Sequence, residues 1–194
     1  MPAYDERTAL VVVDVQNDFA DPEGNLSVPG GHEIVPRVNE EVATATAAGA
    51  LVVYTQDWHP PDTPHFEKDG GTWPVHCVRD TWGAELHPDL VVKGDVLRKG
   101  GGGWDGYSGF SIRDPETGEV ESTGLAEHLA ERGTERIVVV GLATDYCVKE
   151  TALEAVEQGY AATVVRDAIA AVDLEPGDGQ AAIEAMAAAG VTVE

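Results

Sequence analysis

Apolar runs of strand length alternate along this chain with segments in which apolar residues recur every three or four positions. The runs lie at residues 9–15, 50–56, 89–100 (one or two short strands), 136–142, 161–167 and 191–194. The segments with helical periodicity lie at 33–48, 125–133, 145–159 and 179–190. Continuous apolar runs rich in β-branched residues are typical of strands buried on both faces. Their alternation with helices predicts an α/β fold around a mostly parallel sheet.

Residues 57–88 follow neither pattern. They are rich in Pro, Gly, Trp and His and read as one long ordered loop. Loops of that length inside a compact domain usually carry function. In parallel α/β sheets, ligands bind beyond the carboxyl ends of the strands. This loop and the residues that follow each strand are therefore the first candidates for a site.

Length and composition narrow the class of protein. A chain of 194 residues predicts one domain, residues 1–194. The net charge of −23 argues against a nucleic-acid partner, whose phosphates would be repelled. No apolar stretch is long enough to span a membrane and no signal segment is evident, so we expect a cytoplasmic protein without a membrane partner. Two cysteines make no disulfide framework and suit a reducing compartment.

The excess of acid predicts a further property. The chain has 35 acidic residues against 12 basic ones, and only four lysines. Such a surface repels itself, and salt screens that repulsion. We therefore expect a halophilic protein that folds less stably at low ionic strength. An ordinary acidic cytosolic protein is the alternative.

Cys147 is a candidate nucleophile. It falls in the first turn of the helix expected directly after the strand 136–142, where unpaired N–H groups and the helix dipole stabilise a thiolate or an oxyanion. Asp14 ends the first strand and could accept the thiol proton, and a lysine flanking the third strand, Lys93 or Lys99, could balance the charge. The alternatives are a Cys147 that only packs and an Asp14 that caps a backbone N–H.

Four potential metal ligands fall within 20 residues of the long loop: Asp57, His59, His65 and His76. Asp57 and His59 point the same way in an extended segment, and the following Pro60 favours that extended form. A carboxylate with three imidazoles suits Zn, Fe(II) or Mn(II) and leaves positions open for water or substrate. Solvated loop histidines are the alternative, and Cys77 is a further candidate ligand.

Five motifs occur in an order that resembles a known family: "VVVDVQNDF", "TQDWHPPDTPHF", "TWPVHC", "KGGGGWDGYSGF" and "GLATDYCV". From about residue 9 to residue 167 the chain is similar to the nicotinamidase (pyrazinamidase) branch of the isochorismatase-like cysteine hydrolases. The resemblance implies a three-layer α/β/α sandwich. It also implies hydrolysis of nicotinamide, and of pyrazinamide, to the acid and ammonia through a thioester, within NAD salvage and pyridine nucleotide biosynthesis.

The resemblance also assigns roles to residues. It implies a catalytic triad of Asp14, Lys99 and Cys147. It implies one divalent ion, zinc first, that holds the ring nitrogen of the substrate and is bound by Asp57, His59, His65 and His76. Lys99 is preferred over Lys93 because the glycine-rich stretch and "YSGF" follow it.

The resemblance further implies a pocket and an oxyanion site. A cis peptide between Leu142 and Ala143 would aim the N–H groups of Ala143 and Cys147 at the oxyanion. Phe19 and Trp73 would sandwich the pyridine ring, and the remaining lining residues would be Tyr107, Leu142 and Tyr146. Tyr146 stands where some relatives have histidine, which would alter one wall.

Three other functions stay open at this point. One is a different amidase of the same superfamily that acts on a carbamoyl or ureido compound. Another is a hydrolase that activates water on the metal, in which Cys147 only packs. The third is a binding or redox-sensing protein without catalysis. The resemblance leaves a homo-oligomer open.

Overall fold

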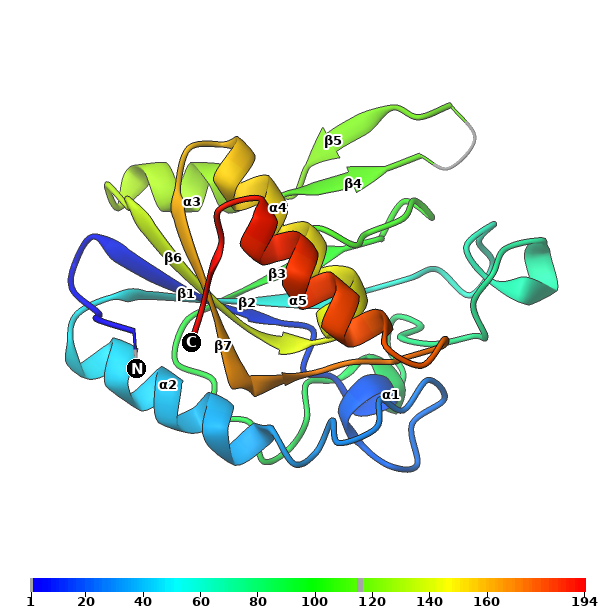
Figure 1. Cartoon of the computed structure of the whole chain (residues 1–194). Helices are drawn as coiled ribbons and strands as arrows, with labels where there is room; N and C mark the ends of the chain where they lie inside the picture. The colour runs from blue at the N-terminus through cyan, green and yellow to red at the C-terminus, as the bar shows by residue number, and fades with distance from the viewer. Residues whose placement is uncertain (1, 115–116) are drawn as a thin grey trace.

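The computed structural model describes residues 2–114 and 117–194, and a parallel sheet lies at its centre (Figure 1). Six strands pair in the order β3-β2-β1-β6-β7-β8, and every pairing is parallel. The strands are β1 (Thr8–Val13), β2 (Leu51–Asp57), β3 (Asp95–Lys99), β6 (Arg136–Leu142), β7 (Ala161–Ala170) and β8 (Thr192–Val193). The predicted α/β fold is confirmed.

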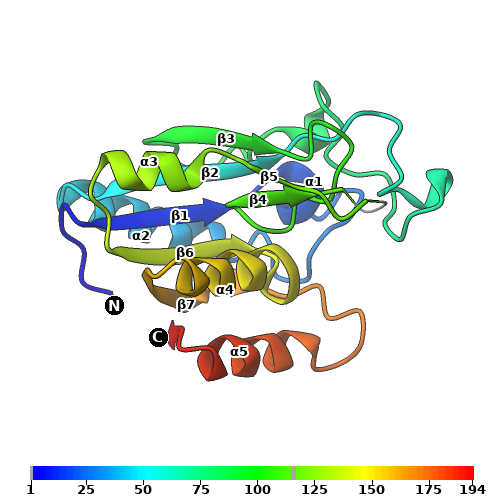
Figure 2. The same cartoon turned by 90° about the horizontal axis from the view of Figure 1, so that it is seen from above.

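Helices cover both faces of this sheet and give three layers (Figures 1 and 2). The helices are α1 (Asn17–Ala20), α2 (Val35–Ala47), α3 (Leu125–Glu131), α4 (Lys149–Glu157) and α5 (Asp178–Ala188). Apolar residues of α1 and α2 belong to one core cluster, and those of α3, α4 and α5 belong to the other. Among the described residues, no helix has both the length and the apolar character that crossing a membrane requires.

β1 shows why an unbroken apolar run becomes a central strand. Successive side chains of a strand point to opposite faces. Leu10 and Val12 accordingly enter the cluster under α2, while Val11 and Val13 enter the cluster under α3 and α4. Each of these side chains is at most 1% exposed. When both faces of a strand are buried, apolar residues are favoured at every position. The sequence of such a strand therefore does not alternate between apolar and polar residues.

Several elements differ from the prediction. β7 runs to Ala170 rather than residue 167, and its register with β6 shifts between Val139 and Gly141. The predicted helix 145–159 begins as a π-helical turn, η3 (Thr144–Val148), before α4. An antiparallel hairpin of β4 (Ser111–Arg113) and β5 (Val120–Ser122) was not predicted, because its strands have only three residues and little burial. The long loop contains two 3₁₀ turns, η1 (Glu67–Asp69) and η2 (Trp82–Ala84).

The parallel strands all end at one edge of the sheet, and the long loop lies at that edge (Figure 1). Asp14 follows the last residue of β1, Asp57 is the last residue of β2, and Lys99 is the last residue of β3. Cys147 follows β6 within η3. The fold therefore places these four polar residues on neighbouring strand ends.

Candidate active site

Lys99 joins the two carboxylates and the thiol at the centre of the site. Its Nζ lies 2.7 Å from Asp14 Oδ2, 2.6 Å from Asp57 Oδ1 and 3.7 Å from Cys147 Sγ. The same ammonium donates to the carbonyl oxygen of Gly106. Ligand atoms of Asp14, Asp57 and Cys147 all lie within 4.8 Å of one another. The structure therefore brings together the three residues of the predicted triad.

Lys93, the rival candidate, lies elsewhere. It precedes β3, and its side chain is exposed. The register of β3 against β2 pairs Lys99 with Asp57, which puts the Lys99 side chain at the carboxyl end of the sheet. Of these two lysines, only Lys99 contacts the candidate site.

Burial and charge fix the protonation of this group. Burial would lower the pKa of Lys99, but Asp14 and Asp57 raise that pKa well above its usual range. Burial would raise the pKa of Asp57, but Lys99 and His59 hold it below its ordinary value. Burial raises the pKa of Asp14 to about 6, although Lys99 opposes the rise. Near neutral pH, Lys99 is thus a cation and the carboxylates are ionised.

The groups around Cys147 act on the pKa of its thiol in opposite directions. Burial raises the pKa of its thiol well above the usual range, with Lys99 opposing this effect and the two carboxylates adding to it. The buried surroundings of Cys147 therefore favour the protonated form of its resting sulfur. Asp14 Oδ2 is paired with Lys99 but has no partner in hydrogen-bond geometry, so it is free to accept that proton.

Three imidazoles form a cluster next to this group. The ring centroids of His59 and His65 are 4.7 Å apart, and those of His59 and His76 are 5.2 Å apart. One ring nitrogen from each of the three lies within 4.8 Å of the others. The remaining oxygen of Asp57, Oδ2, lies 3.7 Å from His59 Nε2. The predicted carboxylate and three imidazoles thus lie together, with Asp57 shared between Lys99 and the cluster.

The polar atoms of this cluster fit a bound cation. His65 Nδ1 lies 2.6 Å from Asp105 Oδ1, and His76 Nδ1 lies 2.7 Å from the carbonyl oxygen of Pro74. Such outer contacts normally fix the ring of a metal-binding histidine and leave Nε2 for the ion. Both ring nitrogens of His59 are buried without a hydrogen-bond partner, which is costly unless an ion supplies one. These four residues could hold a divalent metal.

Gly100, in the glycine-rich stretch that follows Lys99, lies at a position that requires a glycine. Its φ is 77°, in the left-handed region, and a Cβ there would come within 2.8 Å of His59 Nδ1. A side chain at Gly100 would displace the imidazole from the cluster. Cys77, the further candidate ligand, does not belong to the group of ligand atoms that the three imidazoles form, and its Sγ lies 3.9 Å from the carbonyl oxygen of Gly83.

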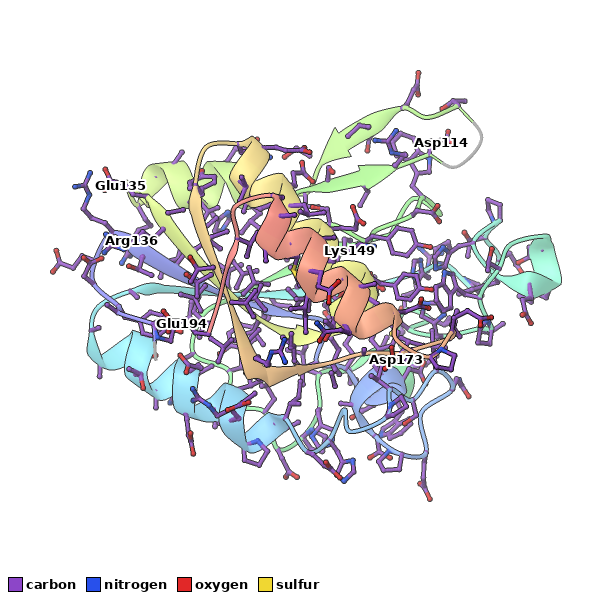
Figure 3. All side chains as sticks on the ribbon, in the orientation of Figure 1. Asp114, Glu135, Arg136, Lys149, Asp173 and Glu194 are labelled. Carbon is purple, nitrogen blue, oxygen red and sulfur yellow. The ribbon has the colours of Figure 1, made fainter. Side chains whose placement is uncertain are left out.

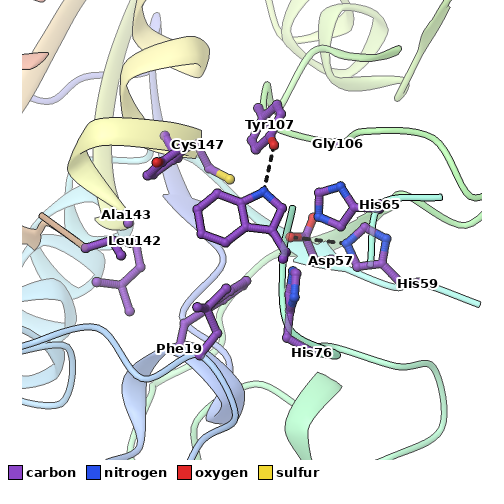
Figure 4. A pocket seen from close by; sticks show the side chains of 14 residues that line it. Phe19, Asp57, His59, His65, His76, Gly106, Tyr107, Leu142, Ala143 and Cys147 are labelled. Carbon is purple, nitrogen blue, oxygen red and sulfur yellow. Dashed lines mark hydrogen bonds and ion pairs between the residues drawn. The ribbon is translucent and has the colours of Figure 1, made fainter. Parts of the chain in front are cut away.

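A pocket with about 440 Å³ of unfilled space, part of it open to solvent, lies between Cys147 and the imidazoles. Figure 4 shows Cys147 on one side of this pocket and His59, His65 and His76 on another. All the predicted pocket residues line it: Phe19, Trp73, Tyr107, Leu142, Ala143 and Tyr146. Leu26 and Val172 also line it and were not predicted.

Aromatic side chains make up much of the wall. Trp73 Nε1 donates a hydrogen bond of 2.8 Å to Tyr107 Oη, and the rings of Trp73 and Tyr146 meet edge to face at 4.8 Å. Tyr146 thus packs as part of this wall. The peptide between Leu142 and Ala143 is cis, as the resemblance implied.

Sequence reasoning missed three buried or half-buried contacts of the site: Gln16, Thr55 and Asp105. Gln16 contacts the backbone of Asp57, and Thr55 contacts the carboxylate of Asp14. Asp105 contacts the imidazole of His65. A polar residue inside an apolar strand, as Thr55 is in "ALVVYTQ", was the one local signal available. The partners of Gln16 and Asp105 lie about 40 residues away, at separations of 41 and 40.

Known proteins resemble this chain over nearly its whole length. The isochorismatase domain family matches residues 8–194. A nicotinamidase of Acinetobacter baylyi is 40% identical over 202 residues, covering 94% of this chain and 90% of that protein. The crystal structure of the pyrazinamidase of Pyrococcus horikoshii in complex with zinc has a TM-score of 0.86 and 39% identity, covering 97% of this chain and 98% of that one. PnC1 from L. infantum, solved in complex with nicotinate, has a TM-score of 0.88 and 34% identity, covering 100% and 95%.

Proposed function

Because this chain belongs to the isochorismatase family, we propose that its pocket hydrolyses a small aromatic amide by attack of a cysteine. The substrate is nicotinamide, and the products are nicotinate and ammonia. Nicotinamidases similar over most of the chain support this activity. One observation supports the chemistry most: Lys99 Nζ contacts Asp14, Asp57 and Cys147, and the last two of these residues line one pocket with the imidazole cluster. Pyrazinamide is a further proposed substrate.

Proton transfer begins the proposed reaction. Asp14 takes the proton of the Cys147 thiol, and Lys99 stabilises the sulfur anion that forms. The sulfur attacks the carboxamide carbon, and the carbonyl electrons move to oxygen. The N–H groups of Ala143 and Cys147 hold that oxyanion, where one donor commonly contributes about 3 kcal/mol.

Asp14 then acts as an acid and later again as a base. Its proton goes to the leaving nitrogen, so ammonia departs and a thioester to Cys147 remains. A water molecule attacks the thioester while Asp14 takes a proton from it. The carbon–sulfur bond breaks, and Asp14 returns its proton to the sulfur. The acid that forms loses its own proton to solvent and leaves as nicotinate. Asp14 thus moves one proton in each half of the cycle.

We propose that Asp57, His59, His65 and His76 hold one divalent ion, zinc first, with Fe(II) or Mn(II) as alternatives. When bound, such an ion supplies a Lewis-acid contact for the pyridine nitrogen and so orients the substrate. Phe19 and Trp73 would enclose the ring between them, as their place in the pocket wall supports. Burial lowers the pKa of His76 to about 4, so this imidazole stays neutral and can act as a ligand near pH 7.

Further proposals rest on composition and on family resemblance. We propose that residues 1–194 act as one domain in the cytoplasm and serve NAD salvage. Two free, buried cysteines suit a reducing compartment. We also propose that the protein is adapted to high salt, because its net charge is −23.

The test uses the two cysteines of this chain as a matched pair. Purified protein is incubated with nicotinamide, and ammonia and nicotinate are measured for the wild type, Cys147→Ala and Cys77→Ala. We expect the wild type and Cys77→Ala to release both products in equal amounts and Cys147→Ala to release neither. Near-normal turnover by Cys147→Ala would refute cysteine catalysis. Turnover of ureido or carbamoyl amides in place of nicotinamide would identify the alternative amidase.

A further inference from the structure

Backbone pairing between β1 and β2 stops just before the two carboxylates of the site. The paired positions run from Ala9 with Leu51 to Val12 with Tyr54. Asp14 then has a φ of 49°, in the left-handed region, and this conformation turns the chain away from the strand direction. Side chains must therefore hold the two strand ends together at the point where Asp14 and Asp57 flank Lys99.

Thr55 makes the first of these contacts. Its hydroxyl accepts a hydrogen bond of 3.2 Å from the Asp14 backbone N–H and donates one of 2.7 Å to Asp14 Oδ1. Thr55 is 1% exposed, so no water competes for these bonds. With Oδ1 held, the other oxygen, Oδ2, is the one that faces Lys99. Thr55 thereby selects which oxygen of Asp14 can accept a proton.

Gln16 makes the second contact. Its Oε1 accepts a hydrogen bond of 2.8 Å from the backbone N–H of Asp57, and its Nε2 donates one of 2.8 Å to the Asp57 carbonyl oxygen. Nε2 also donates to the carbonyl oxygen of Ala84 at 2.9 Å. Gln16 is 0% exposed. One side-chain amide thus supplies both bonds that a neighbouring strand would make to Asp57.

We propose that Thr55 and Gln16 are positioning residues that set the two carboxylates on either side of Lys99. Neither has a substrate contact in this scheme; each acts through the carboxylate that it holds. Thr55 acts on the proton transfer of Asp14, and Gln16 acts on the placement of Asp57 between Lys99 and the imidazole cluster. This inference rests on the proposed function for the role of Asp14 and on the proposed ion for the role of Asp57.

The two roles predict different losses. Thr55→Val keeps the shape of the side chain and removes both bonds to Asp14, so kcat should fall about 10- to 100-fold, as expected for a lost hydrogen bond to a charged group. Its zinc affinity should stay within about twofold of the wild type, because no proposed ligand is touched. Thr55→Ser restores the hydroxyl and should restore kcat. Gln16→Met should instead weaken zinc binding about 10- to 100-fold, the usual effect of losing an outer contact to a ligand.

The chain offers matched controls for both positions. Thr8 is also a buried threonine whose hydroxyl donates to a carboxylate, Asp5 Oδ1 at 2.9 Å, but it lies at the opposite edge of the sheet. Figure 3 labels Glu135 and Arg136 at that edge, and Arg136 pairs with Thr8 in the sheet. The side chain of Gln56 donates to the same carbonyl oxygen of Ala84 as Gln16 does, but it makes neither of the two hydrogen bonds that Gln16 makes to the backbone of Asp57. Thr8→Val and Gln56→Met should change the melting temperature without either specific loss.

The experiment measures three quantities on the full chain. These are kcat and KM for ammonia release from nicotinamide, zinc affinity of the metal-stripped protein against a chromophoric chelator, and melting temperature. The rate at which iodoacetamide alkylates Cys147, followed by peptide mass, reports the same proton transfer without nicotinamide. That rate should fall in Thr55→Val and recover in Thr55→Ser. Should Gln16→Met fail to fold, the shorter amide in Gln16→Asn replaces it.

Distinct results separate this inference from the proposed function. A wild-type protein that releases no ammonia from nicotinamide would refute the proposed function, while alkylation rates and zinc affinities would still decide the positioning roles. Thr55→Val with unchanged kcat and unchanged alkylation, or a Thr8→Val loss of the same size, would overturn the role of Thr55. Gln16→Met with wild-type zinc affinity would overturn the role of Gln16.

Discussion

Removing the charge of Lys99 tests the electrostatic arrangement of the site most directly. Its Nζ lies 2.7 Å from Asp14 Oδ2 and 2.6 Å from Asp57 Oδ1, and the residue is 2% exposed. At an effective dielectric constant of about 20, each contact corresponds to about 6 kcal/mol of attraction, which desolvation partly offsets. Removing one partner of a buried pair typically costs about 3–5 kcal/mol. Lys99→Met, which keeps the length of the side chain, should therefore lower the free energy of unfolding by about that amount at pH 8.

The pH dependence of this loss follows from Asp14. Its pKa of about 6 lies above the ordinary 3.8, so the folded state favours the protonated form. Ionised Asp14 destabilises the fold above pH 6, and this effect disappears as the pH falls through 6 towards 3.8. Lys99 reduces this destabilisation only while Asp14 is charged, because the stabilising contact is between two opposite charges. The difference in unfolding free energy between Lys99→Met and the wild type should therefore be smaller at pH 5 than at pH 8.

Urea denaturation followed by tryptophan fluorescence measures these differences. Lys68→Met is a matched control, because Lys68 also contacts two carboxylates at 2.7 and 2.6 Å but has a side chain that is 40% exposed. That variant should leave the free energy of unfolding nearly unchanged. Adding Asp14→Asn to Lys99→Met should recover about 1–3 kcal/mol relative to additivity, since neighbouring charges couple by that amount. Additive effects, or equal losses from the two lysine variants, would refute the reasoning.

Three other predictions concern solution conditions. Because Asp14 must be ionised to act as a base, kcat/KM should fall about tenfold for each pH unit below about pH 6. Lys99 stays charged, so kcat/KM should not fall between pH 7 and pH 9. A flat profile from pH 4 to 8, measured with the metal retained, would contradict this prediction. Chelation should raise KM at least as much as it lowers kcat, and added zinc should reverse both; a pure loss of kcat would instead indicate that the ion generates the nucleophile. With a net charge of −23, the melting temperature should be higher in about 2 M than in about 0.1 M KCl, and equal values would exclude the halophile hypothesis.

The secondary structure was easiest to predict where strands are buried on both faces, because an unbroken apolar run of that length then indicates a central strand. β1, β2 and β6 were predicted to within two residues for this reason. The irregular parts were not predictable, because their conformation depends on distant atoms. Gly141 has a φ of 112°, and a Cβ there would lie 2.1 Å from the carbonyl oxygen of Val13 on the neighbouring strand. The register shift between β6 and β7 occurs next to this glycine. A glycine inside a strand indicates a bulge or a close backbone approach, but "RIVVVGL" does not show which neighbouring strand causes it.

The site was predictable to the extent that its residues end strands. The rule that parallel strands present their carboxyl ends together predicts from the sequence alone that Asp14, Asp57 and Cys147 lie in one region. It could not choose between Lys93 and Lys99, since the choice depends on the register of β3 against β2. Thr55 and Gln16 were missed because their roles exist only once β1 and β2 separate beyond Val12 and Tyr54. Strand separation is a property of the three-dimensional fold rather than of either segment.

The raised pKa of Cys147 is consistent with its proposed role as a nucleophile. A resting thiolate would add a third anion beside Asp14 and Asp57, with Lys99 as the shared cation, among side chains that are all buried. Transfer of the proton to Asp14 instead moves one negative charge from Oδ2 to Sγ, and both atoms lie within 3.7 Å of Lys99 Nζ. The net charge of the group does not change, so little additional desolvation is required. In the free enzyme, alkylation or oxidation of Cys147 therefore requires that its proton first move to Asp14, which slows both reactions relative to a resting thiolate.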